Sequence, residues 1–397
     1  MRDGTLAVAP VDERVYALVA ESGVERDLFS QRQHRCCELV DRYVLHLAVS
    51  VVQMLDLPPL LDAPRTVTEI LAARRLVPTF RPALEWLLER LTAAGLLTRE
   101  ASARGGPYHL RAPLPPAALD ALRAAVLERD PAYAPTFALL DEAAAVYPRV
   151  ASGELTGEQA LFQKVALWCA YFDNANPFYA LNNRLAAPVA TARLPAEDAA
   201  VLELGAGLGS ATEAFLLHLR ATGRLHVPAS YRVTEPVAFF RRRAQRTLTG
   251  AWPSVPLDFA GLDVNLPWRE QGVGPGSFHL VWAVNVLHLA RDLDRTLGET
   301  FRALAPGGWV VLGEAIRPFP GQVVGAEFPF QLLRSFVEVD TDPERRPTHG
   351  FLAPEHWVAT LRRAGFTPVE LVPDLFRVRE LFSGFFAGVV CGRRPAA

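Results

Sequence analysis

The segment Val201–Gly209, with the sequence VLELGAGLG, constrains the fold of this chain more than any other feature. Its first half is apolar, as expected for a buried strand, and glycine then occupies every second position. Gly205, Gly207 and Gly209 allow a tight turn and a close approach of the backbone to a ligand. The spacing differs from the G-x-G-x-x-G of dinucleotide-binding folds. The segment therefore predicts a nucleotide-cofactor loop at the carboxyl end of a parallel strand.

Two acidic residues accompany this loop. Glu203 lies inside the first strand, where it would be poorly placed beside a pyrophosphate and well placed beside a cationic ligand. Glu235 ends the next strand-like run, Tyr231–Glu235, and its carboxylate can accept both hydroxyls of a ribose. We therefore predict that both acids contribute to the cofactor site.

Strands and helices alternate from Ala199 onward. Mostly apolar strands separated by helices indicate a parallel sheet with both faces covered. The predicted strands are residues 201–204, 231–234, 257–260, 279–284 and 309–314, with further strands near 369–371 and 386–390. The fold class is thus α/β with a Rossmann-like sheet, in which ligands bind at the carboxyl ends of the strands.

The later strand ends carry further polar groups. Asp263 can accept a hydrogen bond from an adenine amino group, and Asn285 follows the next strand. His288 and Glu314 are 26 residues apart, enough for one helix and one strand, so both should lie on the same rim. A carboxylate beside an imidazole makes the imidazole a better base. The alternative is that His288 caps a helix and Glu314 pairs with an arginine such as Arg317.

The first half of the chain is predicted to be helical, with helices near residues 40–55, 67–71 and 82–94. A short strand follows that last helix, and Tyr108–Leu110 returns across a Gly105-Gly106-Pro107 turn. Helices followed by a hairpin are typical of a winged helix. The expected recognition helix, 79–91, balances acids with bases and therefore lacks a surface for phosphates. A cap over an active site, or a contact between subunits, is the better use of this module.

An aromatic and polar segment, Tyr171–Tyr179, precedes a helix over residues 181–191. Such a segment can pack a corner, cover a cofactor or shape a substrate pocket. The candidate substrate contacts are Tyr171, Phe172, Tyr179, Phe330 and His349. The predicted domains are a helical, winged-helix-like cap or dimerisation domain (1–170), a connecting segment and helix (171–195) and a cofactor-binding domain (196–397).

Composition narrows the class of protein. The formal net charge is −2 and 21% of residues are charged, which gives no electrostatic case for nucleic acid or an anionic membrane. The four cysteines lack metal-ligand spacing, so we expect reduced thiols and no metal. No uncharged apolar stretch of about 20 residues occurs, and no signal peptide is evident. These features predict a cytoplasmic enzyme.

The motifs now support a resemblance. In motif order, residues 201–314 resemble the class I S-adenosylmethionine (SAM) methyltransferases. Roughly residues 80–370 resemble the carbon methyltransferase domains of modular polyketide synthases. The matching segments are LRAPLPP (110–116), NPFYALNNRLAA (176–187), NVLHLARDL (285–293), LAPGGWVVLGE (304–314) and LAPEHWVATLRRAGF (352–366).

The resemblance implies roles for individual residues. In those domains the histidine of the N-V-L-H run and the glutamate that ends the next strand form a dyad for carbon methylation. By that match His288 is the general base and Glu314 its partner. SAM would be bound by Gly205, Gly207, Gly209, Glu235, Asp263 and Asn285, with Glu203 facing its methionine end. The implied acceptor is an activated carbon alpha to a carbonyl in a polyketide-like substrate, free or bound to an acyl carrier protein.

Other interpretations stay open. The chain has no carrier-protein serine motif and no ketosynthase region, so we expect a free-standing protein. Natural-product O-methyltransferases also combine a winged helix with a His and a Glu, but many read His-Asp-Trp where His288 is followed by Leu289. The alternatives are therefore an O-methyltransferase acting on a small hydroxyl, or a protein that cyclises SAM or transfers no methyl. A homodimer is also left open.

Overall fold

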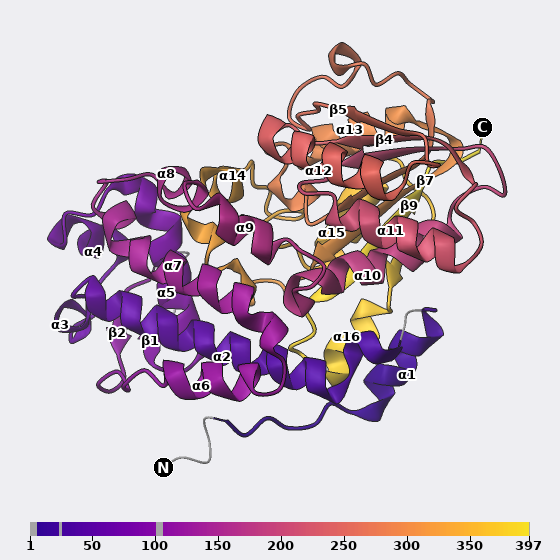
Figure 1. The fold of residues 1–397 in the computed structure, drawn as a ribbon. Coiled ribbons are helices and arrows are strands. Elements are labelled where there is room, and N and C mark those ends of the chain that lie inside the picture. Colours follow the sequence, from indigo (N-terminus) through magenta and orange to yellow (C-terminus); the bar gives the residue numbers. More distant parts are fainter. Residues whose placement is uncertain (1–5, 24–25, 101–105, 397) are drawn as a thin grey trace. The chain divides into compact units, whose positions relative to one another are not determined.

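The computed structural model describes residues 6–23, 26–100 and 106–396, and its contacts divide the chain into two units (Figure 1). One unit is formed by Met1–Pro10, Gln31–Tyr171 and Gln322–Val337. The other is formed by Val11–Ser30, Phe172–Gly321 and Glu338–Ala397. We refer to them as the helical unit and the sheet unit.

The helical unit is built around α2 (Gln31–Met54), which packs against α5, α6 and α7. Val40, Val44, Leu47 and Val51, which lie at helical spacing on α2, are all buried. The other helices of the unit are α3 (Pro58–Leu61), α4 (Val67–Ala73), α5 (Arg81–Ala93), α6 (Leu119–Leu127), α7 (Ala134–Ala151), α8 (Gly157–Phe162), α9 (Val165–Tyr171) and α14 (Arg334–Val337). The helical character predicted for the first half of the chain is therefore confirmed.

A two-stranded hairpin follows α5. Strands β1 (Leu97–Arg99) and β2 (Tyr108–Leu110) are antiparallel, with Leu97 opposite Leu110. The turn predicted between them begins at Gly105, which lies outside the described residues. Glu89 of α5 accepts from Arg99 Nη1 and from the Tyr108 hydroxyl, both at 2.5 Å. Glu89 of α5 thus neutralises the charge of Arg99 in the hairpin.

Residues 322–337 belong to the helical unit and residues 11–30 to the sheet unit, which the sequence did not predict. In the helical unit, Trp86 Nε1 donates to Glu327 Oε2 at 3.0 Å, and the Tyr147 hydroxyl donates to the Phe328 carbonyl at 2.7 Å. In the sheet unit, Phe29 stacks on Phe385 with ring centroids 4.9 Å apart. The sequence-based division was 1–170, 171–195 and 196–397; in the structure, residues 322–337 group with the helical unit and residues 11–30 with the sheet unit.

The sheet has seven strands in the order β5-β4-β3-β6-β7-β9-β8. Strands β3 to β7 are parallel, and β9 is antiparallel to both of its neighbours. The bounds are β3 (Ala199–Leu204), β4 (Pro228–Thr234), β5 (Leu257–Ala260), β6 (Phe278–Val284), β7 (Leu304–Ala315), β8 (Val369–Val372) and β9 (Ala387–Arg393). The predicted Rossmann-like alternation is confirmed. Strand β7 begins five residues earlier than predicted because Leu304 already pairs with Phe278.

Helices pack on this sheet. The consecutive residues Leu280 to Val284 of β6 are all buried, and because neighbouring side chains point to opposite faces, both faces are covered. Helix α10 packs against β6, β7 and β9, and α13 packs against β6 and β7. The helices of the unit are α1 (Glu13–Glu21), α10 (Pro177–Ala192), α11 (Ser210–Ala221), α12 (Ala238–Ala251), α13 (Leu293–Ala303), α15 (Pro354–Arg363) and α16 (Leu375–Leu381).

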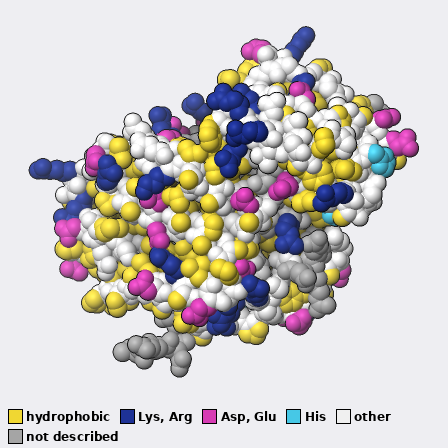
Figure 2. Space-filling view, in the orientation of Figure 1, with side chains coloured by type: hydrophobic (Ala, Val, Ile, Leu, Met, Phe, Trp, Pro, Cys, Tyr) yellow, Lys and Arg dark blue, Asp and Glu magenta, His cyan; other side chains and the backbone are white. Residues whose placement is uncertain are grey.

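Helix α12 carries the basic run of the chain. Arg242, Arg243 and Arg246 are exposed, and Arg241 turns back to donate from Nη1 to the Glu235 carbonyl at 2.5 Å. Dark blue side chains gather over α12 in Figure 2. Arg241 thus binds the backbone at the end of β4, and the other three arginines face solvent. Among the described residues, no helix is long and apolar enough to cross a membrane.

Candidate active site

The carboxyl ends of the five parallel strands bring the predicted site residues to one rim of the sheet. Strands β4 and β5 lie on one side of β3, and β6 and β7 lie on the other, so the strand order reverses between β3 and β6. Ligands of doubly wound sheets bind at such a reversal. The glycine loop follows β3 directly. Glu235 and Asp263 follow the strands on one side, and Asn285, His288 and Glu314 lie at the strand ends on the other.

The three glycines of the loop have positive φ angles of +62°, +56° and +88°. Their surroundings differ. A Cβ on Gly205 would lie 2.7 Å from Val286 Cγ2, and one on Gly209 would lie 2.7 Å from Leu248 Cδ1. A Cβ on Gly207 would meet nothing within 4 Å. We expected both Gly205 and Gly207 to make room for a ligand. In the structure a side chain at Gly205 would clash with Val286, and of the three loop glycines only Gly207 faces open space.

Glu203 is buried within a polar network of the sheet unit. Its Oε2 accepts from Thr212 Oγ1 at 2.8 Å and from the Tyr231 hydroxyl, which in turn accepts from Trp282 Nε1 at 3.0 Å. Its Oε1 is buried and has no hydrogen-bond partner among the described residues. Burial raises the pKa of this carboxyl to about 7, against the opposing hydrogen bonds from Tyr231 and Thr212. Near neutral pH the group is therefore partly protonated.

This shift predicts how stability depends on pH. Because the folded chain holds the Glu203 proton more tightly than the unfolded chain does, its contribution to stability is complete below the ordinary pKa of 4.5 and is lost as the pH rises through about 7. Glu203→Gln keeps a neutral side chain at every pH. Without cofactor, its free energy of unfolding should fall less between about pH 5 and about pH 8 than that of the wild type. Urea titrations at the two pH values measure this, and equal falls would refute it.

Glu235 ties the glycine loop to the end of β4. Its Oε2 accepts from the Gly207 N–H at 3.0 Å, and its Oε1 accepts from the Val237 N–H at 2.8 Å. The side chain is buried, and burial raises the pKa of its carboxyl. Each oxygen keeps a further lone pair for a ligand hydroxyl. On the next strand end, Asp263 is half-buried and its Oδ1 accepts from the Asn265 N–H at 2.9 Å.

His288 and Glu314 form a buried pair. His288 Nδ1 lies 2.6 Å from Glu314 Oε2. The other carboxylate oxygen accepts from the Leu287 N–H at 2.9 Å and from the Val286 N–H at 3.3 Å. A carboxylate only accepts, so Nδ1 carries the proton of this hydrogen bond and the lone pair of the ring is on Nε2. The pair can therefore orient an imidazole whose Nε2 is a base.

Asn285 is held in a conformation that is rare for residues other than glycine. Its φ is +55°, and its Oδ1 accepts from Asn182 Nδ2 and from the Ala315 N–H, both at 2.8 Å. The side chain thus links the end of β6 to α10 and to the end of β7. Asn182 was not among the predicted site residues, because it lies 103 positions away in the sequence.

The predicted connecting segment contacts the first turn of α11, which follows the glycine loop directly. Asn174 Nδ2 donates to the Ser210 carbonyl and to Glu213 Oε2, both at 2.8 Å, and Ser210 Oγ donates to the Phe172 carbonyl. The rings of Phe172 and Tyr179 lie 5.1 Å apart. Two of the candidate substrate contacts are thereby brought to the start of α11.

The other candidates are Tyr171, Phe330 and His349. Tyr171 belongs to the helical unit, where it packs edge-on against Trp168 and Phe330. His349 belongs to the sheet unit, and its carbonyl accepts from Arg317 Nη2 at 3.4 Å. Phe351, which was not predicted, packs edge-on against the His288 ring at 5.1 Å.

Comparisons with known proteins show which family and fold the chain is similar to. Residues 202–310 match a family model described as a methyltransferase domain. The chain is 34% identical over 173 residues to the lovastatin diketide synthase mokB of Monascus pilosus, covering 44% of this chain and 6% of that protein. It is 30% identical over 323 residues to the non-reducing polyketide synthase dpmpA of Macrophomina phaseolina, covering 78% of this chain and 14% of that protein. The chain thus spans a small fraction of these relatives.

Two solved structures share the fold. One is the CurJ carbon methyltransferase, with a TM-score of 0.77, 22% identity and 97% of each chain covered. The other is the citrinin polyketide synthase CMeT domain, with a TM-score of 0.71, 18% identity, and 97% of this chain and 95% of that one covered. The chain therefore carries a SAM-dependent methyltransferase domain that is related to polyketide synthases and has the fold of their carbon methyltransferase domains.

Proposed function

We propose that the chain methylates an activated carbon alpha to a carbonyl, with His288 as general base. The observation that carries this proposal is the buried contact of 2.6 Å between His288 Nδ1 and Glu314 Oε2 at the rim of the sheet. A carbon acid must lose a proton before it can attack a methyl group, and a positioned base speeds that loss by roughly 10²–10⁴-fold.

SAM would be held by the glycine loop and by the strand ends beside it. The residues fit such a group in two respects: the Cβ position of Gly207 opens into free space, and Glu203 Oε1 is a buried acceptor without a partner among the described residues. Glu235 would accept the ribose hydroxyls, and Asp263 would face the adenine. When bound, SAM supplies an electrophilic methyl group.

The roles of the chain's own residues follow from the contacts. Glu314 would hold the His288 ring through Nδ1 and stabilise the imidazolium that forms when Nε2 takes the proton. The electron pair of the broken C–H bond would remain on the acceptor, delocalised into its carbonyl. The hydrogen bonds of Asn285 and Asn182 would keep the ends of β6 and β7 at a fixed distance.

A substitution at Glu235 tests the cofactor site. We expect Glu235→Ala to weaken SAM binding by about 1–3 kcal/mol, because the ribose hydroxyls lose a charged acceptor. Isothermal calorimetry with SAM measures this. The matched control is Asp258→Ala, which removes an exposed acid paired with Arg232 on the same sheet. Equal affinities for Glu235→Ala and wild type would remove Glu235 from the cofactor site.

The acceptor class is proposed from the relatives. The curated matches are polyketide synthases, so we propose a polyketide-like acceptor, free or bound to an acyl carrier protein. We also propose that the N-terminal helices and the winged-helix-like hairpin act as a cap or dimerisation domain. Light scattering on the full chain gives the oligomeric state that separates these two roles.

Labelled SAM tests the proposed reaction. The chain would be incubated with SAM carrying a ¹³C methyl and with β-keto thioesters, free and carrier-bound, and the products analysed by NMR and mass spectrometry. Label in a C–CH₃ group supports the proposal. Label in an O–CH₃ group would assign an O-methyltransferase, and SAM bound or consumed without transfer would assign a protein that methylates none of these acceptors.

A further inference from the structure

A buried arginine of the sheet unit contacts the backbone of the His288 turn. Arg346 is 3% exposed. Its Nη2 donates to the His288 carbonyl at 2.5 Å, and its Nη1 donates to the Ala290 carbonyl and, at 3.4 Å, to the Arg291 carbonyl. One guanidinium thus binds three carbonyls within four consecutive residues.

The geometry points to Arg346 as a positioning residue that fixes the backbone of His288, an inference that rests on the proposed function. The side chain transfers no proton. Its planar group, with several donors in fixed directions, suits a turn whose carbonyls have no partners in a regular helix. The catalytic imidazole is then held at both ends: Glu314 fixes the ring through Nδ1, and Arg346 fixes the main chain.

The position of Arg346 is itself fixed by the loop that carries it. The N–H of Arg346 donates to the Asp342 carbonyl, and the N–H of Asp342 donates to the Arg346 carbonyl, both at 2.8 Å. The N–H of Asp340 donates to the Arg291 carbonyl at 2.8 Å. The loop is therefore joined to the turn by main-chain as well as side-chain hydrogen bonds.

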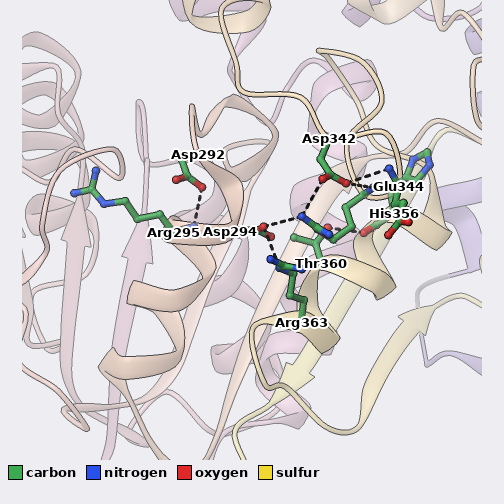
Figure 3. Close-up of polar contacts among 9 residues, drawn as sticks. Asp292, Asp294, Arg295, Asp342, Glu344, His356, Thr360 and Arg363 are labelled. Atoms are coloured by element: carbon green, nitrogen blue, oxygen red, sulfur yellow. Dashed lines mark hydrogen bonds and ion pairs between the residues drawn. The ribbon is translucent and has the colours of Figure 1, made fainter.

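An outer layer of ion pairs anchors this loop to α13 and α15. Asp294 accepts from Arg345 Nη2 at 3.2 Å and lies 3.3 Å from Arg363 Nε, and Asp342 accepts from Arg345 Nη2 at 3.1 Å (Figure 3). Asp294, Asp342, Arg345 and Arg346 are among the residues that line a cavity of about 210 Å³. The cavity gives a small solute access to the neighbourhood of the guanidinium.

The protonation state of Arg346 also suits this role. Burial lowers the pKa of its guanidinium to about 10, opposed by the negative charges of Asp340, Glu314 and Asp292. The group therefore stays a cation at neutral pH, and its hydrogen bonds to the carbonyls are charge-assisted. Burying a guanidinium costs desolvation free energy. The hydrogen bonds of Arg346 to the three carbonyls offset that cost.

Variants at positions 346 and 362 test the inference. We expect Arg346→Ala to lower kcat by about 10- to 100-fold with the Kd for SAM unchanged, because the imidazole is misplaced while the cofactor loop is not. Arg362→Ala removes an exposed arginine of α15 and leaves Arg346, Arg345 and their partners in place, so it should keep kcat within about threefold of wild type. Added guanidinium at millimolar concentration should restore part of the kcat of Arg346→Ala, because the cavity admits it.

Two comparisons keep the outcomes distinct. If His288→Ala is inactive but Arg346→Ala keeps wild-type kcat, the inference fails and the proposed function stands. If His288→Ala keeps wild-type turnover, the proposed function itself fails. Should Arg346→Ala not fold, Arg346→Lys replaces it: an ammonium cannot span three carbonyls, so a lower kcat with unchanged SAM affinity is expected, and a kcat equal to wild type would overturn the inference.

Discussion

His288→Ala is expected to lower turnover by roughly two to four orders of magnitude while leaving SAM affinity nearly unchanged. The reason is that the imidazole would act only on the acceptor, as a general base, whereas the cofactor would be held by the glycine loop and Glu235. Single-turnover kinetics and calorimetry on the same preparation separate the two quantities. His279→Ala is the matched control, because His279 is exposed at the other end of the same strand.

A variant of Glu314, the partner of His288, tests the same prediction independently. Glu314→Gln should lower turnover less than His288→Ala, and the double variant should be less than additive because the two side chains act as a unit. Near-normal turnover in His288→Ala would refute the dyad. Loss of SAM binding in that variant would instead give His288 a structural role.

Gly207→Leu is expected to abolish SAM binding at concentrations that saturate the wild type. The Cβ position of Gly207 opens into free space, so a leucine there would extend into the volume assigned to the cofactor. Calorimetry with SAM measures the loss. Circular dichroism should show that the fold persists.

The control for this prediction is Gly223→Leu. Gly223 has a φ of +71° and, like Gly207, nothing within 4 Å of its Cβ position, but it lies in the turn after α11. Both variants place a side chain at an unfavourable φ, so they share the backbone strain. Wild-type SAM affinity in Gly223→Leu and none in Gly207→Leu would assign the loss to the cofactor volume. Wild-type affinity in Gly207→Leu would contradict the site.

Much of the sheet could be predicted from local patterns. The run from Val201 to Gly209 encodes a strand and its turn within nine residues, and parallel strands place successive strand ends on one rim whatever the rest of the chain does. The separation of 26 residues between His288 and Glu314 therefore predicted their neighbouring strand ends, and the structure places their side chains in contact.

The parts that could not be predicted depend on contacts across long stretches of sequence. Arg346 binds a carbonyl 58 positions before it, and Asn182 binds a side chain 103 positions after it. The exchange of residues 11–30 and 322–337 between the units depends on ring packing, such as that of Phe29 on Phe385, which leaves no periodic signal. When only the sequence is considered, arginines and asparagines are expected to be solvent-exposed.

Glu203 and Gly205 have structural roles within the protein in addition to the roles in cofactor binding that the sequence suggested. Sequence reasoning assigned both to the cofactor. In the structure Glu203 Oε2 is engaged by Thr212 and Tyr231, and Gly205 makes room for Val286. The protein's own side chains thus hold the loop, whose Cβ position at Gly207 opens into free space.

The most direct test of the central claim, that His288 removes a proton from carbon, is hydrogen exchange at the acceptor. A β-keto thioester would be incubated in D₂O with the wild type or with His288→Ala, in the presence of S-adenosylhomocysteine, and its alpha position followed by NMR. We expect the wild type to exchange that position faster than the spontaneous rate and His288→Ala to fall to the spontaneous rate. Exchange at equal rates in the two proteins, with methyl transfer intact, would contradict the account.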